Sequence, residues 1–137
     1  MSAVALQEAL AAEHAAIFLH SALGARTSRS DAPDLAEALT AAYRVHLQRR
    51  SRLIARLDQL GADPIAAEPG YRIPADLNGT GAVRRRALRV ERDCAATYAH
   101  LVATTTGTDR DLGISWLVDA ATRELDFGGK PRRLPGL

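Results

Sequence analysis

The stretch that decides the fold spans residues 61–80 and reads GADPIAAEPGYRIPADLNGT. Prolines and glycines recur throughout it, which argues against a regular helix or strand. It separates two pairs of segments with helical periodicity, residues 2–26 and 33–60 before it and residues 82–105 and 108–127 after it. An irregular connection this long fits a compact domain when it crosses the full length of a helical bundle. We therefore predict an all-α four-helix bundle with one long crossover between the second and third helices.

The lengths of these segments are compatible with such a crossover. A helix of about 25 residues is about 37 Å long, and about 11 extended residues span that distance. The turns at residues 27–30 and 106–108 are short, so each helical pair is antiparallel. The second and third helices are then parallel, and we expect them to be neighbours. Residues 1–127 form one domain, followed by a tail, residues 128–137, that is loose or packed on a partner.

The composition favours the same fold and limits the function. Alanine is abundant, whereas valine, isoleucine and aromatic residues are scarce, which favours helix over sheet. A single cysteine, Cys94, excludes an internal disulfide. The N-terminus has no signal-peptide pattern, and no apolar run is long enough for a bilayer. We therefore expect a cytoplasmic protein with no membrane partner.

Acids and histidines interrupt the apolar stripes near the middle of the predicted helices. The stripes read Leu6, Leu10, Glu13, Ile17, His20, Gly24, then Leu39, Tyr43, His46, Arg50, Leu53, Leu57, Leu60, then Ala87, Glu91, Cys94, Tyr98, Leu101. Their steps alternate three and four residues, which is the spacing of a bundle seam. Glu13, His46 and Glu91 lie at a similar depth, as does Asp119 on the fourth helix. Because buried ionisable groups are costly unless paired or bound to metal, the stripes predict a polar site inside the bundle.

Five stretches of the chain carry a family resemblance. They are LQEALAAEHAAI (6–17), HLQRR (46–50), LGADP (60–64), AEPGYR (67–72) and LPG (134–136). On these stretches the chain resembles ferritin-like domains and, more closely, a small actinobacterial ferritin-like family of unknown function. The likeness covers nearly the whole chain. It implies a ferritin-like bundle in which helices 1 and 3 each supply a glutamate to a metal site and helices 2 and 4 each supply a Glu-x-x-His pair.

The metal pattern that the resemblance implies is only partly present. The positions that match it are Glu13, His46, Glu91 and Asp119. Tyr43 stands where the second helix should carry a glutamate, and Thr122 stands where the fourth should carry a histidine. A pair of metal ions needs bridging carboxylates to hold the two cations close together. The resemblance therefore implies a degenerate metal site.

Two interpretations of this polar core are open. In the first, which we favour, no cofactor is bound, and the acids pair with His46, Arg50 or Tyr43 through charge-assisted hydrogen bonds. Cys94 is then a small buried hydrophobe, and His20 is a hydrogen-bonded core histidine. In the second, the four matching positions hold iron or manganese, and the protein is a metal-dependent oxidoreductase or a ferroxidase-like protein.

The surface pattern predicts partners rather than a reaction. The fourth helix is more apolar than one core seam requires, so we expect a homodimer through Ile114, Leu117, Val118 and Leu125. The basic run from Arg84 to Arg92 is interpreted first as a solvated face and second as a site for an acidic partner. The second helix would extend this face with Arg49, Arg52 and Arg56. Nucleic acid is not expected, because no aromatic residues alternate with the arginines. We therefore predict a non-catalytic binding or interaction domain.

Overall fold

The computed structural model describes residues 2–137 and is a bundle of four helices, with no strand among those residues. The helices are α1 (Ser2–Ala25), α2 (Pro33–Gln59), α3 (Gly79–Thr104) and α4 (Gly107–Asp126). The predicted all-α four-helix bundle is confirmed, and each predicted helix end lies within one turn of the observed one. No helix in the part of the chain that is described is both long enough and apolar enough to cross a bilayer.

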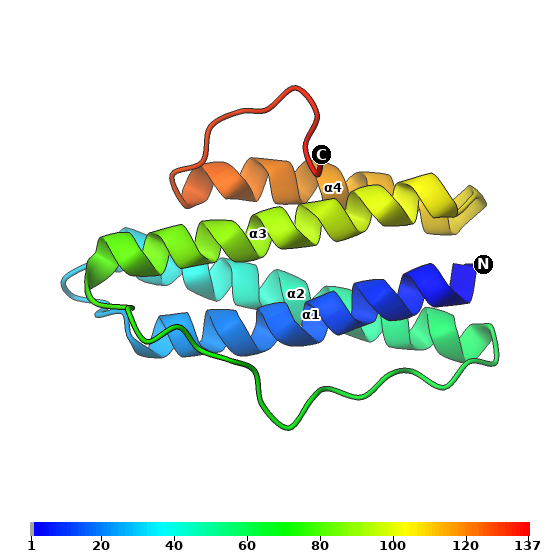
Figure 1. The fold of residues 1–137 in the computed structure, drawn as a ribbon, viewed down its shortest axis with the longest axis horizontal. Coiled ribbons are helices and arrows are strands. Elements are labelled where there is room, and N and C mark those ends of the chain that lie inside the picture. Colours follow the sequence, from blue (N-terminus) through cyan, green and yellow to red (C-terminus); the bar gives the residue numbers. More distant parts are fainter. Residues whose placement is uncertain (1) are drawn as a thin grey trace.

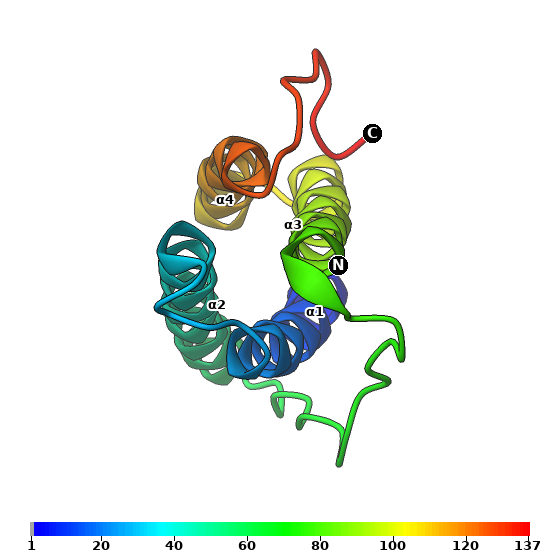
Figure 2. The same cartoon turned by 90° about the vertical axis from the view of Figure 1, so that its left-hand side faces the viewer.

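The helices are arranged around a square. α1 packs against α2 and against α3, and α3 packs against α4, whereas α2 and α3 barely touch. Figure 2 accordingly shows α2 diagonal to α3, with α4 beside α2. The expectation that α2 and α3 are neighbours is therefore wrong, although the two helices do run parallel (Figure 1). As a consequence Arg49, Arg52 and Arg56 lie beside α4 and do not extend the basic run of α3.

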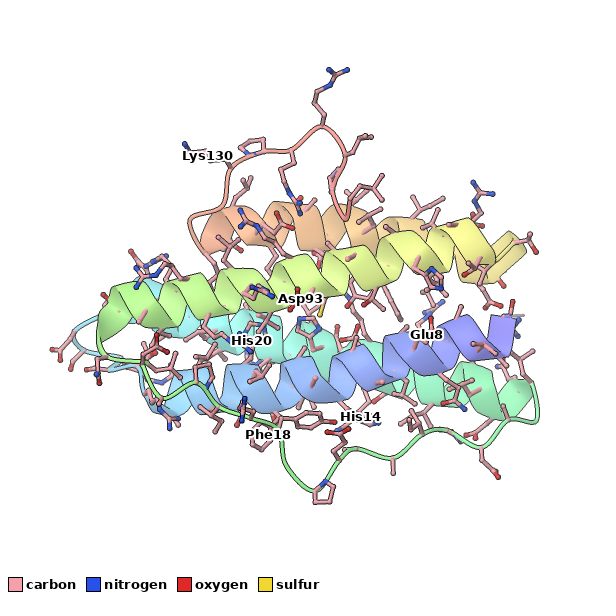
Figure 3. All side chains as sticks on the ribbon, viewed as in Figure 1. Glu8, His14, Phe18, His20, Asp93 and Lys130 are labelled. Carbon is pink, nitrogen blue, oxygen red and sulfur yellow. The ribbon has the colours of Figure 1, made fainter. Side chains whose placement is uncertain are left out.

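The crossover between α2 and α3 returns along the outside of α1 (Figure 1). Side chains of α1 hold it in place. The Gln7 side-chain oxygen accepts a hydrogen bond from the amide of Ile65 (2.8 Å), and His14 Nε2 donates to the Ile65 carbonyl (3.0 Å). The Phe18 ring packs against the Tyr71 ring at 5.3 Å between centroids. Figure 3 shows His14 and Phe18 pointing toward the crossover, so this face of α1 fixes the path of the chain.

The tail after α4 packs against its own bundle, so the expectation that it is loose is wrong, whereas its packing on a partner stays a prediction. Arg132 Nη2 lies 2.7 Å from Glu124 Oε1 of α4. Gly136 approaches α3 so closely that a Cβ there would lie 2.6 Å from the carbonyl oxygen of Ala95, and its φ is +84°. Both features favour glycine at this position, because any side chain would push the tail away from α3.

The interior consists of two apolar clusters with a polar layer between them. The larger cluster includes Leu6, Leu10, Leu53, Leu57, Tyr98, Leu101 and Trp116. The smaller cluster, at the other end of the bundle, includes Leu23, Leu35, Leu39, Val83 and Phe127. Each fully buried leucine contributes about 1.5–3 kcal/mol. These clusters hold the four helices in register and so position the polar layer between them.

Candidate functional site

His46 of α2 lies at the centre of the polar layer and joins two carboxylates. Its Nδ1 lies 2.5 Å from Glu13 Oε2 of α1, and its Nε2 lies 2.7 Å from Glu91 Oε2 of α3. All three side chains are fully buried. A carboxylate can only accept, so both ring nitrogens donate and His46 is an imidazolium. Burial by itself would lower the pKa of His46, but hydrogen bonds to Glu13 and Glu91 outweigh it and raise the pKa to about 9.

His20 of α1 reaches the same glutamate from the other side. Its Nε2 lies 3.1 Å from Glu91 Oε2, and its ring stacks between those of His46 and Phe127. Burial lowers the pKa of His20, so it is neutral and donates through Nε2. The expected hydrogen-bonded core histidine is therefore observed, and Figure 3 shows His20 directed into the bundle. Burial opposes ionisation of Glu91, but the hydrogen bonds from His20 and His46 outweigh it and hold its pKa well below the usual range.

Tyr98 and Arg49 extend the network toward α4. The Tyr98 hydroxyl donates to Glu13 Oε1, and Arg49 Nη1 donates to the Tyr98 hydroxyl at 3.1 Å. Arg49 is only 5% exposed, and its Nη2 pairs with a carboxylate oxygen of Asp119. Arg123 is four residues after Asp119 and lies 3.2 Å from that carboxylate and 3.5 Å from Glu91 Oε1. The two arginines thus supply fixed positive charge next to the buried acids.

Three of the four predicted metal-site residues meet, and the fourth does not. Glu13, His46 and Glu91 converge as expected. Asp119 is 42% exposed and pairs with Arg49 and Arg123 on the far side of the network. His20 occupies the fourth place around the centre instead. Convergence of the three residues follows from their equal depth, but it does not establish that they bind a metal.

The other predicted core residues divide between the interior and its edge. Cys94 is buried, as expected, and burial raises the pKa of its thiol well above the usual value. Tyr43 is half-buried and lines a cavity of about 140 Å³ beside His20. Arg50 is also half-buried, and the cation that reaches the acids is its neighbour Arg49. Arg49 follows His46 by three residues, which is the signal that could have identified it.

The residues present do not fit a pair of metal ions. Arg49 and Arg123 pair with Asp119 and lie next to Glu91, and Tyr43 and Thr122 provide neither a carboxylate nor an imidazole. Formal charges in the layer balance without a metal, because three acids face three cations: Glu13, Glu91 and Asp119 face His46, Arg49 and Arg123. Potential ligand atoms of His20, His46 and Glu91 do lie within 4.8 Å of one another. These three residues could hold one ion. They could do so only after His46 loses a proton, because a protonated ring nitrogen cannot bind a metal.

The basic run of α3 is partly paired within the chain. Arg84 donates to the carbonyl of Asp126 at 3.1 Å, and Arg92 lies 4.0 Å from a carboxylate oxygen of Glu124. These contacts tie α3 to the end of α4. An acidic partner for the run from Arg84 to Arg92 stays a prediction.

Comparison with known proteins gives a family and a fold. A family model described as "Domain of unknown function (DUF4439)" matches residues 5–137. The crystal structure of a conserved hypothetical protein, rv2844, from Mycobacterium tuberculosis is similar, with a TM-score of 0.84 and 26% sequence identity. The match covers 93% of this chain and 94% of that one. No curated protein matches the sequence.

Proposed function

The chain belongs to the DUF4439 family, and we propose that it is a non-catalytic interaction domain of ferritin-like architecture whose metal site is replaced by paired side chains. The observation that carries this proposal is His46, whose two ring nitrogens are both engaged by buried carboxylates. An imidazolium in this position supplies the positive charge that a metal ion supplies between carboxylates in ferritin-like sites. Arg49 and Arg123 neutralise the remaining acids.

Electrostatics support a metal-free state. To bind a divalent ion, His46 must lose a proton that is held with a pKa of about 9, which weakens metal binding at neutral pH. The ion would also lie close to Arg123, whose Nε is 3.5 Å from Glu91. The proton on His46 and the positive charge of Arg123 both oppose metal binding. The ligand set has too few carboxylates to offset these two effects.

Metal analysis tests the proposal directly. We expect the protein to retain no iron or manganese after anaerobic incubation with either ion followed by desalting, because the network is already neutral. Elemental analysis of the wild type and of a double Glu13→Gln, Glu91→Gln variant provides the measurement. Equal and negligible metal content in both proteins is the expected result. A wild type that retains about one metal per chain, lost in the double variant, contradicts the proposal.

A single iron or manganese ion is the second candidate, favoured by the 4.8 Å group of His20, His46 and Glu91. These three residues would hold one ion, with Glu13 accepting a hydrogen bond from His46 Nδ1 on the other side of the ring, and the ion would supply redox chemistry to an oxidoreductase or a ferroxidase-like protein. The same metal analysis distinguishes this candidate from the first.

We propose further that the interaction surface joins two copies of this chain. Ile114, Val118 and Leu125 are exposed along α4. Beside them an apolar cavity of about 320 Å³ is bounded by α4 and the prolines of the tail. The tail carries two projecting leucines, Leu134 and Leu137. A face that presents both a hollow and projecting side chains can bind a second copy about a two-fold axis, and an exposed apolar patch favours such association.

Self-association is tested by placing a charge on this face. We expect the wild type to be a dimer in analytical ultracentrifugation and the Val118→Asp variant to be a monomer, because a carboxylate buried at an interface loses its hydration. The matched control is Val4→Asp on α1, since Val4 is 59% exposed and Val118 is 62% exposed. Val4→Asp should stay dimeric. A monomeric wild type at high concentration refutes the dimer.

A further inference from the structure

α2 and α4 line an open cavity that takes no part in the proposed metal-free core or in the proposed dimer face. Its volume is about 530 Å³, and it lies over Arg49 and Asp119 of the network and over Trp116 of the larger apolar cluster. This size falls within the range of small-molecule sites. The lining residues of the cavity come from α2 and α4, which lie side by side in Figure 2. It involves a different face of α4 from the one that carries Val118.

The cavity has an excess of positive charge. Arg49 forms its floor, and the exposed Arg52 lies at its rim. The lining contains one carboxylate, that of Asp119, and it pairs with both Arg49 and Arg123. Arg52 also lines an adjoining cavity of about 320 Å³, where the guanidinium of Arg56 is already bound to Asp109. The lining therefore attracts an anion, and Arg52 is the cation available to it.

The floor of the cavity already binds a carboxylate. Arg49 holds the carboxylate of Asp119, and its guanidinium carbon lies 5.0 Å from the centroid of the Tyr98 ring and 5.5 Å from that of Trp116. Such stacking fixes the plane of the guanidinium, which favours planar recognition of carboxylates. Trp116 is itself held edge-on against Tyr98. It thus presents a rigid apolar wall next to the charged floor.

From this arrangement we propose that the cavity between α2 and α4 binds a small organic acid, whose carboxylate is held by Arg52 and Arg49 and whose hydrocarbon part packs against Trp116. The residues fit both halves of such a molecule, since Val45 adds to the apolar wall and Gln48 and Ser115 add polar groups. The inference depends neither on a metal-free core nor on the dimer.

The chain has a single tryptophan, Trp116, which lines this cavity, so tryptophan fluorescence provides a probe of binding there. The probe is cyclohexanecarboxylate, which does not absorb where tryptophan is excited, and calorimetry gives a second measure of binding. We expect a saturable change with a Kd of about 1 mM or tighter. Cyclohexanecarboxamide has the same shape without the charge and should bind much more weakly. Equal binding of the amide, or no saturable binding of the acid, overturns the proposal. Inorganic phosphate that binds as tightly as the acid overturns the assignment to an organic acid.

Three variants test the roles of the charges. Arg52→Gln should weaken binding by about tenfold, because a charge-assisted hydrogen bond is lost. Arg85→Gln, an exposed change on α3, is the matched control and should leave the Kd unchanged. Asp119→Asn should tighten binding, because it removes the carboxylate that competes for Arg49, and circular dichroism verifies that the variant is folded. An Arg52→Gln variant with wild-type affinity, or an Asp119→Asn variant that binds more weakly while folded, counts against the proposal.

Discussion

Replacing Glu91 by alanine is expected to lower the free energy of unfolding by about 3–5 kcal/mol. The Glu91 carboxylate accepts from His46 at 2.7 Å and from His20 at 3.1 Å, and it lies 3.5 Å from Arg123. Its removal leaves the His46 imidazolium with one hydrogen-bond partner and the neutral His20 with none, and both rings lie in the interior. Breaking one member of a buried ion pair costs more than the pair contributes, because the remaining charge stays desolvated. Urea unfolding followed by circular dichroism measures the change.

Two further variants identify the cause of this loss. Glu91→Gln keeps the shape and one acceptor oxygen for the histidines while it removes the charge and replaces the other oxygen by an amide NH2, so we expect a smaller loss of about 1–3 kcal/mol. Glu37→Ala removes an exposed glutamate of α2 and should change stability by no more than about 0.5 kcal/mol. If Glu91→Ala unfolds at the same urea concentration as Glu37→Ala, the buried network does not stabilise the fold.

The fold could be predicted from the sequence because its signals are long and repeated. Helical periodicity in four segments predicts the four helices, and the length of residues 61–80 predicts the direction of the third. The equal depth of Glu13, His46 and Glu91 then brings them together. The sequence did not predict which helices are neighbours. Helix directions alone do not decide whether α2 and α3 share an edge or a diagonal of the square. The structure places them on the diagonal.

The partners within the site were harder to predict than its centre. Arg49 and Arg50 differ by about 100° around the helix, and a stripe that alternates three and four residues accommodates either. The rotation of α2 against α1 decides between them, and it directs Arg49 inward. Asp119 was expected to face the centre, yet two arginines hold it on the outer side. Such pairings depend on tertiary packing, which a single sequence does not specify.

Stability is expected to fall as the pH rises from about 6.5 to about 9. The pKa of His46 is raised from 6.5 to about 9 in the folded protein. A raised pKa contributes stability that is fully present below the unfolded value and is lost as the pH rises through the folded value, and here it amounts to about 3 kcal/mol. Glu91 acts at the other end, because its lowered pKa contributes stability that is lost as the pH falls below about 4.5. The pKa of His20 is lowered, so its protonation in the unfolded chain also weakens folding below about 6.5.

Urea midpoints measured from pH 4 to pH 10 in steps of one half unit test this profile. The variants change only a histidine and keep the charged residues around His46, namely Glu13, Glu91, Arg49 and Arg123. In His46→Gln the loss between pH 6.5 and pH 9 should disappear, because the titrating group is gone, even though the variant is less stable throughout; the raised pKa of the Cys94 thiol acts only above about pH 9. His100→Gln is the matched control: His100 is exposed and pairs with Glu8 at 3.2 Å at the surface, where solvent screens the charge. It should retain the wild-type profile. A wild type whose stability is constant between pH 6.5 and pH 9 would show that His46 is not an imidazolium in the folded protein, and the argument for a network in place of the metal would fail with it.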